Sequence, residues 1–144
     1  MRMIGYVKAV DPLLTFKSIV VETILRVEGK HSGIFNSSYF SVICRVLEMY
    51  KSGKFGCNWM PISVCGDVEY IIKKIHKDMY PQETKESFVS CMSEVFWCFD
   101  NSDISNLSSN RYKKAVAFLK NVSSLCDERM EKRRCSFETT TAEE

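Results

Sequence analysis

The residue types able to do chemistry in this 144-residue chain are mainly two histidines and seven cysteines. His31 stands among glycine and serine residues, which is typical of a solvated turn. His76 lies between Lys74 and Lys77, which favours a surface position on a helix. Catalysis and zinc binding both require several such groups in a defined arrangement. The sequence therefore predicts that the chain is not an enzyme and that it has neither a metal site nor a cofactor.

The cysteines do not form a pattern of paired or metal-binding residues. Their number is odd, no Cys-x-x-Cys is present, and no secretory signal precedes them. These features favour a reducing compartment, and most of the thiols are expected to be small buried hydrophobic groups. Cys98 adjoins Trp97 on an aromatic-rich segment, where burial would raise the pKa of the thiol rather than activate it. Both tryptophans, Trp59 and Trp97, are expected in the core.

Composition and charge exclude further classes of function. The formal net charge is +2, from 20 basic and 18 acidic residues, so no electrostatic footprint for nucleic acid is present. The basic run 129–134 is followed by an acidic end and is interpreted as a solvated helix end. No apolar run reaches the roughly 18 residues of a membrane span, so we expect no membrane anchor. Apolar residues make up 45% of the chain, which predicts an ordered globular domain.

The elements that position these residues are all helical. Glycine, proline and polar clusters separate segments whose apolar residues recur every three or four positions, and no segment alternates with a period of two. We expect two short turns in residues 3–10, then helices over about 12–28, 38–52, 58–79, 82–99 and 109–128. The fold class is all-α, a single-domain bundle over residues 1–128, and the polar residues 129–144 are expected to form a frayed or disordered tail.

Capping signals support these boundaries. Asp11 is a candidate N-cap with Pro12 at the first helical position, and Gly53 is expected just past a helix end. Asn58 is a candidate N-cap for the next helix, with Pro61 in its first turn. That helix has the broadest apolar stripe, so it is expected to be the central hydrophobic helix of the bundle, surrounded by amphipathic helices.

Two short stretches resemble motifs of one known family. Residues 48–53 read Glu-Met-Tyr-Lys-Ser-Gly, and residues 58–62 read Asn-Trp-Met-Pro-Ile. Together they resemble the first homology motif of the Bcl family of apoptosis regulators. Residues 25–29, Leu-Arg-Val-Glu-Gly, resemble the third motif of the family, Leu-x-x-x-Gly-Asp. The similarity extends over about residues 19–119 and implies a helical bundle of the Bcl type.

The chain departs from the family pattern at several positions. Met60 and Pro61 replace the usual Gly and Arg, and Lys30 replaces the aspartate that follows the motif glycine. The second homology motif is not recognisable, and Asn110-Arg111 is the nearest equivalent in position. Such erosion, together with a short chain and no carboxy-terminal anchor, resembles virus-borne members of the family.

The resemblance implies an apolar groove that holds a partner helix. Its implied occupant is the amphipathic death-motif helix of pro-apoptotic Bcl-family proteins, inserted through apolar anchors spaced about one helical turn apart. Arg45 or Lys54 is a candidate replacement for the missing arginine, and Asn58 is both a helix cap and a groove residue. The groove positions expected from the resemblance are Phe35, Tyr39, Phe40, Arg45, Glu48, Met49, Asn58, Met60 and Val64.

The implied function is inhibition of host cell apoptosis, exerted in the host cytoplasm with recruitment to mitochondria through partners. Two alternatives stay open. The first is a Bcl-fold viral protein that blocks innate immune signalling through flat helical faces or self-dimers, without binding death-motif helices. The second is a structural helix bundle unrelated to the family, which would have no groove. An unoccupied apolar groove also allows a homodimer.

Overall fold

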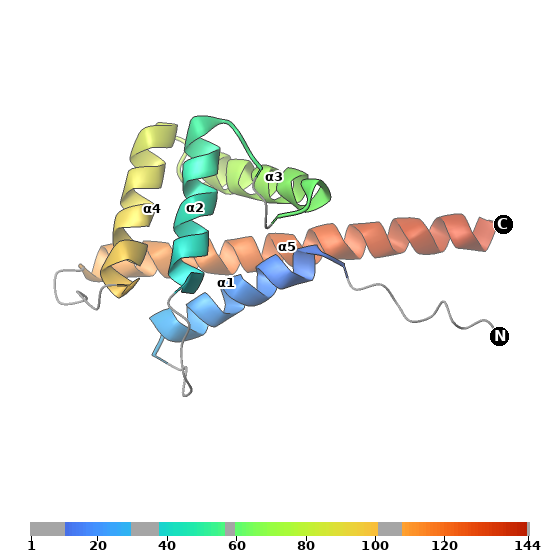
Figure 1. The fold of residues 1–144 in the computed structure, drawn as a ribbon, viewed down its shortest axis with the longest axis horizontal. Helices are drawn as coiled ribbons and strands as arrows, with labels where there is room; N and C mark the ends of the chain where they lie inside the picture. Colours follow the sequence, from blue (N-terminus) through green and yellow to red (C-terminus); the bar gives the residue numbers. More distant parts are fainter. Residues whose placement is uncertain (1–10, 30–37, 57–59, 101–107, 144) are drawn as a thin grey trace.

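The computed structural model describes residues 11–29, 38–56, 60–100 and 108–143. Within these ranges the chain forms helices and no strand, so the predicted all-α class is confirmed (Figure 1). The turns expected in residues 3–10 lie outside the described residues. The helices are α1 (Leu13–Val27), α2 (Ser38–Ser52), α3 (Ile62–Met79), α4 (Lys85–Asp100) and α5 (Ser109–Glu143).

The long helix α5 packs against α1, α3 and α4. Helices α2 and α4 lie side by side and cross α5, whereas α1 runs along α5 (Figure 1). Helix α3 packs against α2 and α5. Thus α2 and α5 each contact three other helices, and the core lies where their inner faces meet.

Helix α1 begins and ends close to where the sequence predicts. The Asp11 carboxylate accepts a hydrogen bond from the Leu13 amide (3.0 Å), and Pro12 already has helical dihedral angles (φ −58°, ψ −25°). The helix begins one residue later than predicted, at Leu13 with Pro12 in the N-cap position, and the Asp11 carboxylate satisfies the first helical amide from just outside the helix. At the other end Gly29 adopts φ 72°, a left-handed conformation that favours glycine, and its amide donates to the Arg26 carbonyl.

We predict that Asp11→Ala lowers the free energy of unfolding by about 1 kcal/mol at pH 7, because a helix cap is lost. The Asp11 carboxylate accepts two hydrogen bonds from Arg133, and these lower the pKa of Asp11 below its ordinary value. A carboxyl whose pKa is lowered on folding stabilises the charged form, so its contribution is complete well above about pH 4 and disappears as the pH falls through the lowered pKa. Urea denaturation at pH 7 and pH 3 should show the difference between wild type and variant shrinking in acid.

The matched control is Asp11→Asn, which keeps a capping oxygen but removes the charge. It should retain the part of the stability that comes from the cap and lose the pH-dependent part that comes from the ion pair with Arg133. An Asp11→Asn variant as unstable as Asp11→Ala would show that the ion pair, and not the cap, provides the stabilisation.

Helix α2 ends as predicted, but α3 begins later than predicted. Gly53 has φ 78°, and its amide donates to the carbonyls of Met49 and Tyr50, so the helix closes at Ser52. Pro61 has an extended ψ of 149°, and its carbonyl accepts from the amides of Val64 and Cys65. Pro61 is therefore the N-cap of α3. The prediction of a helix starting at Asn58, with Pro61 in its first turn, is wrong, because a residue that precedes proline is driven out of the helical region.

Helices α4 and α5 confirm the predicted segments after Pro81 and near Ser109. The Thr84 hydroxyl accepts from the Ser87 amide (3.0 Å), and the Ser108 hydroxyl accepts from the Arg111 amide (3.2 Å). Both are side-chain caps that satisfy amides of the first turn.

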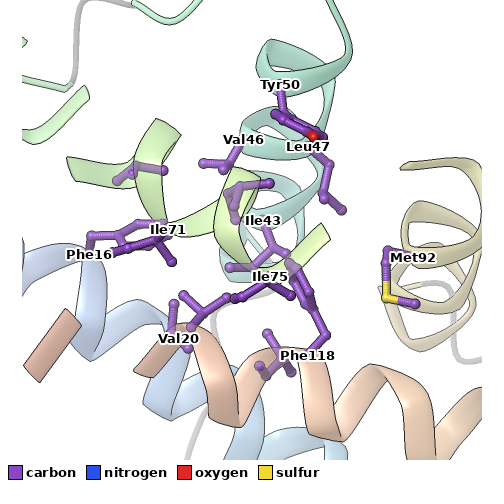
Figure 2. Packing of buried hydrophobic residues seen from close by; sticks show 14 of the residues in the cluster. Phe16, Val20, Ile43, Val46, Leu47, Tyr50, Ile71, Ile75, Met92 and Phe118 are labelled. Atoms are coloured by element: carbon purple, nitrogen blue, oxygen red, sulfur yellow. The ribbon is translucent and has the colours of Figure 1, made fainter. Parts of the chain in front are cut away.

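The core is formed by the inward faces of all five helices. Figure 2 shows residues from each of them converging, with Phe16 of α1, Leu47 of α2, Ile75 of α3, Met92 of α4 and Phe118 of α5 in one cluster. Each of these side chains is almost completely removed from solvent. The spacing of three and four residues seen in the sequence therefore corresponds to the buried stripes of real helices.

Helix α5 continues far beyond the boundary expected at residue 128. Its 35 residues extend about 52 Å, and its last part projects past the other described helices (Figure 1). The expectation of a frayed tail thus differs from the structure over residues 129–143, which are helical. The start of this region is held by tertiary contacts: Met130 packs against the core, and Arg129 and Arg133 form ion pairs with residues outside α5.

Two expectations about burial do not hold. Helix α3 is not surrounded, since Ile62 at its start is 92% exposed and Tyr70 on its outer side is 43% exposed. Trp97, expected in the core, is 58% exposed on the outer side of α4. Trp59 lies outside the described residues. Helix α3 thus lies at one side of the bundle, in contact with α2 and α5.

Across the described ranges, none of the helices combines the length and the apolar character needed to cross a membrane.

Candidate functional site

Four of the predicted groove residues lie in the core. Phe40, Met49, Met60 and Val64 are each no more than 8% exposed and belong to the same hydrophobic cluster. Their groove role stays a prediction, and it requires a packed corner between α2 and α3 to open. Around Phe40 the packing is aromatic, because its ring stacks on Phe96 with centroids 6.4 Å apart.

The corner between α2 and α3 also contains contacts to sulfur. The Gly56 amide donates to the Met49 sulfur (3.5 Å), and the Cys65 thiol donates to the Met60 carbonyl (3.7 Å). The first bond ties the segment after α2 back to that helix, and the second ties Met60 to the first turn of α3. Methionine side chains are adaptable, so this corner is one that repacks at modest cost.

The remaining predicted groove residues fall into two sets. Arg45 and Glu48 are exposed on the outer face of α2, and Tyr39 is half-buried. Phe35 and Asn58 lie outside the described residues. The structure therefore places the predicted charged residues on the surface of α2 and the predicted apolar residues inside, on the inner side of α2 and at the start of α3.

His76 is not the solvated residue that its lysine neighbours suggest. Its Nε2 donates to the Glu83 carbonyl (2.7 Å), since a carbonyl only accepts, and its Nδ1 forms a hydrogen bond with the Tyr50 hydroxyl (2.5 Å). The ring stacks on Phe88 with centroids 4.8 Å apart and 4° between the planes. Burial raises the pKa of Tyr50 above its ordinary value. His76 thus joins α2, α3 and α4 in a structural contact.

A second polar cluster was not expected from the sequence. Asp67 on α3 is only 4% exposed. Its Oδ1 accepts from Arg129 Nε (3.2 Å) and Nη2 (3.1 Å), and its Oδ2 lies 2.7 Å from Arg133 Nη1. Arg133 also contacts Asp11, so one ionic network links α1, α3 and α5. The Arg129 guanidinium additionally lies 4.4 Å from the centre of the Tyr70 ring.

Among the described cysteines, Cys65 and Cys126 are buried, Cys44 and Cys98 are intermediate, and Cys91 and Cys135 are exposed. The expectation that most are buried hydrophobic groups holds for only two of these six. Burial raises the pKa of Cys126 to about 12, so that thiol is inert near neutral pH. Over the residues that the structure describes, no three histidine, cysteine or acidic side chains are placed to hold a metal ion.

A cavity of about 150 Å³ lies away from the predicted groove. It is bounded by α4, the first turns of α5 and the segment that follows α3. Apolar side chains of α4 form its wall, and Arg111 and Lys114 of α5 contribute cations. The sequence offered no signal for it, because its lining residues come from three separate segments between positions 80 and 114.

Comparison of the chain with protein-family models, with curated proteins and with solved structures gives no match.

Proposed function

We propose that this chain is a virus-borne, Bcl-like binding protein without enzymatic activity, which intercepts host regulators of cell death or of innate immune signalling. Support comes from the all-helical fold and from the sequence around its helices. The Leu-x-x-x-Gly stretch spans the end of α1, with Gly29 in the left-handed conformation that closes the helix. The Glu-Met-Tyr-Lys-Ser-Gly stretch ends α2, and the Asn-Trp stretch precedes α3. This order of motifs and helices is the one that the resemblance implies.

The packing between α2 and α3 favours one mode of action. Met49 and Met60 are 8% and 5% exposed, so they offer no open anchor pocket to a partner helix. This single observation favours the mode in which the protein blocks innate immune signalling through its outer helical faces. We refer to this as the outer-face mode.

Capture of a pro-apoptotic death-motif helix is the second candidate, and the methionine-rich corner favours it. Binding in this mode requires the corner to open, and the apparent affinity falls by the fraction of molecules that are open. If about one molecule in a hundred were open, the apparent Kd would be about a hundredfold weaker than that of an open groove. Arg45, exposed on α2, is the candidate cation for the acidic residue of the death motif.

Both modes place the protein in the host cytoplasm, with mitochondrial recruitment through partners in the second. Neither mode involves nucleic acid, a cofactor or a membrane anchor of this chain. A homodimer through the α2–α3 corner would use the same opened surface as a death-motif helix, so the two partners would compete.

Calorimetry with a panel of death-motif peptides, together with cell-based reporters, separates the modes. In the outer-face mode no peptide gives heat, and expression of the chain lowers an innate immune reporter while leaving cells sensitive to apoptosis. In the second mode at least one peptide binds, and Arg45→Glu weakens it about tenfold through charge repulsion. Lys51→Glu, on another side of the same helix, is the matched control and should bind normally. A chain that is inactive in the peptide, immune and apoptosis assays would overturn the proposal.

A further inference from the structure

The cavity beside α4 combines an apolar wall with cations at its edge. Phe88, Met92 and Val95 form the wall, and all three belong to the buried core. Arg111 is partly exposed and Lys114 exposed, and both come from the first turns of α5. Such a combination is typical of a site for a group that is apolar at one end and anionic at the other.

The edge of the cavity is held in place by contacts of its own. The Tyr80 hydroxyl donates to the Lys114 backbone carbonyl (3.4 Å), which ties the segment after α3 to α5. Arg111 Nη1 lies 3.0 Å from Glu94 Oε1, which ties α5 to α4. Because both cations are attached to fixed backbone, less ordering is required when a ligand binds.

The charges at this edge leave one cation unpaired. Over the described residues the Lys114 ammonium takes part in no ion pair, whereas Glu94 engages one nitrogen of Arg111. Glu83 is the carboxylate among the lining residues, and it already accepts a hydrogen bond from the Ser87 hydroxyl (2.5 Å). An incoming carboxylate would therefore meet Lys114 and the free N–H groups of Arg111.

The size of the cavity restricts its occupant. Sites for small molecules and cofactors usually measure about 300–1,000 Å³, so a volume of about 150 Å³ is too small for such ligands. One aromatic or branched aliphatic side chain is of the right size. In many protein interfaces a few buried anchor side chains of this kind provide most of the binding energy.

We propose that this cavity receives one apolar side chain of a partner protein, and that a carboxylate adjacent to that side chain pairs with Lys114 and Arg111. The cavity is then the part of the surface that the protein uses in the outer-face mode. The inference rests on the proposed function in taking the partner to be a host protein. The partner is thus recognised through a short acidic-apolar segment, in contrast to the extended helix that a death-motif groove would take.

The experiment uses the full chain and the dipeptide acetyl-Asp-Phe-amide as the probe. Cys91 lines the cavity and is exposed, so its alkylation by iodoacetamide reports occupancy, and exposed Cys135 serves as an internal control. At a concentration about threefold above a millimolar Kd, the dipeptide should slow alkylation of Cys91 about fourfold. The rate at Cys135 should not change. Equal rates at Cys91 with and without the dipeptide overturn the proposal.

Matched probes and variants test each half of the site. Replacing Phe by Ala in the dipeptide should abolish protection, and replacing Asp by Asn should weaken binding about two- to fivefold, as for a partly exposed ion pair. Lys114→Gln should weaken binding of the Asp-Phe probe by a similar factor, whereas Lys113→Gln, its neighbour, should not. Protection that is equal for Asp and Asn, or for Phe and Ala, would overturn the corresponding half.

Dipeptide protection of Cys91 and the cell-based reporters together distinguish a failure of this proposal from a failure of the proposed function. If the dipeptide does not protect Cys91 but the chain still lowers the immune reporter, only the anchor cavity is wrong. If the dipeptide binds as expected but no reporter responds, the cavity is confirmed and the proposed function is wrong.

Discussion

Asp67→Ala should lower the free energy of unfolding by about 3 kcal/mol, because removing one partner of a buried ion pair leaves charges without compensation. The Asp67 carboxylate is almost fully buried and is bound by two guanidinium groups, those of Arg129 and Arg133. Losses of about 3–5 kcal/mol are usual for buried pairs. Both arginines are partly exposed and can be rehydrated, so the lower end of that range applies.

Urea denaturation followed by circular dichroism measures this loss. Arg134→Ala is the matched control, because Arg134 also lies in the last part of α5 and forms an exposed ion pair with Glu131, and its loss should change stability by no more than about 0.5 kcal/mol. Asp67→Asn keeps the volume and removes the charge, so it should resemble Asp67→Ala. If Asp67→Ala costs no more than Arg134→Ala, the network does not stabilise the fold. Hydrogen exchange should also rise in residues 129–135, since Asp67 anchors that stretch.

Much of the fold could be predicted because it depends on local signals. The Asp11-Pro12 pair encodes a helix start through one side-chain oxygen and one fixed dihedral angle, and Gly53 encodes a helix end through a left-handed conformation. Apolar spacing then identified the buried faces, including those of Phe88, Met92 and Phe96 on α4. These features need no knowledge of distant parts of the chain.

The errors arise where distant residues determine the outcome. Residues 129–143 are polar, which predicted a disordered tail. The helix there is supported by hydrogen bonds from Arg133 to Asp11, 122 positions away in the sequence. His76 has lysines beside it in sequence, but its ring faces Phe88 and Tyr50 from other helices. Trp97 has a large apolar side chain of the kind usually found in a core, whereas the face of α4 on which it lies points outwards. The residues that decide these outcomes lie on other helices, too far away in the sequence for a local pattern to include them.

The candidate site was harder to predict than the fold for a related reason. The resemblance indicates which residues line a groove, but whether Met49 and Met60 face a ligand or the core depends on how closely α2 and α3 approach. Pro61 also places the start of α3 at Ile62, later than the motif implies. The cavity beside α4 depends on the junction of three segments, which does not follow from a motif.

Phe88→Ala should lower the free energy of unfolding by about 3–5 kcal/mol. The ring stacks on His76, and its centroid lies 5.2 Å from that of Tyr80 and 5.9 Å from that of Phe118. Truncation to alanine therefore leaves a void at the junction of α3, α4 and α5 and removes the surface on which the imidazole rests. It also removes a wall of the cavity, so its effect on binding cannot be separated from its effect on folding.

Two further variants identify the source of that loss. Phe88→Leu keeps most of the volume and should cost about 1–2 kcal/mol, because aromatic stacking is lost but no large cavity forms. Trp97→Ala removes a larger aromatic side chain from the same helix and should cost well under 1 kcal/mol, since that ring is more than half exposed. Denaturation midpoints at a constant m value measure all three. If Trp97→Ala were as destabilising as Phe88→Ala, the face of α4 assigned to the core would be wrong, because burial, and not aromatic character, determines the cost of truncation.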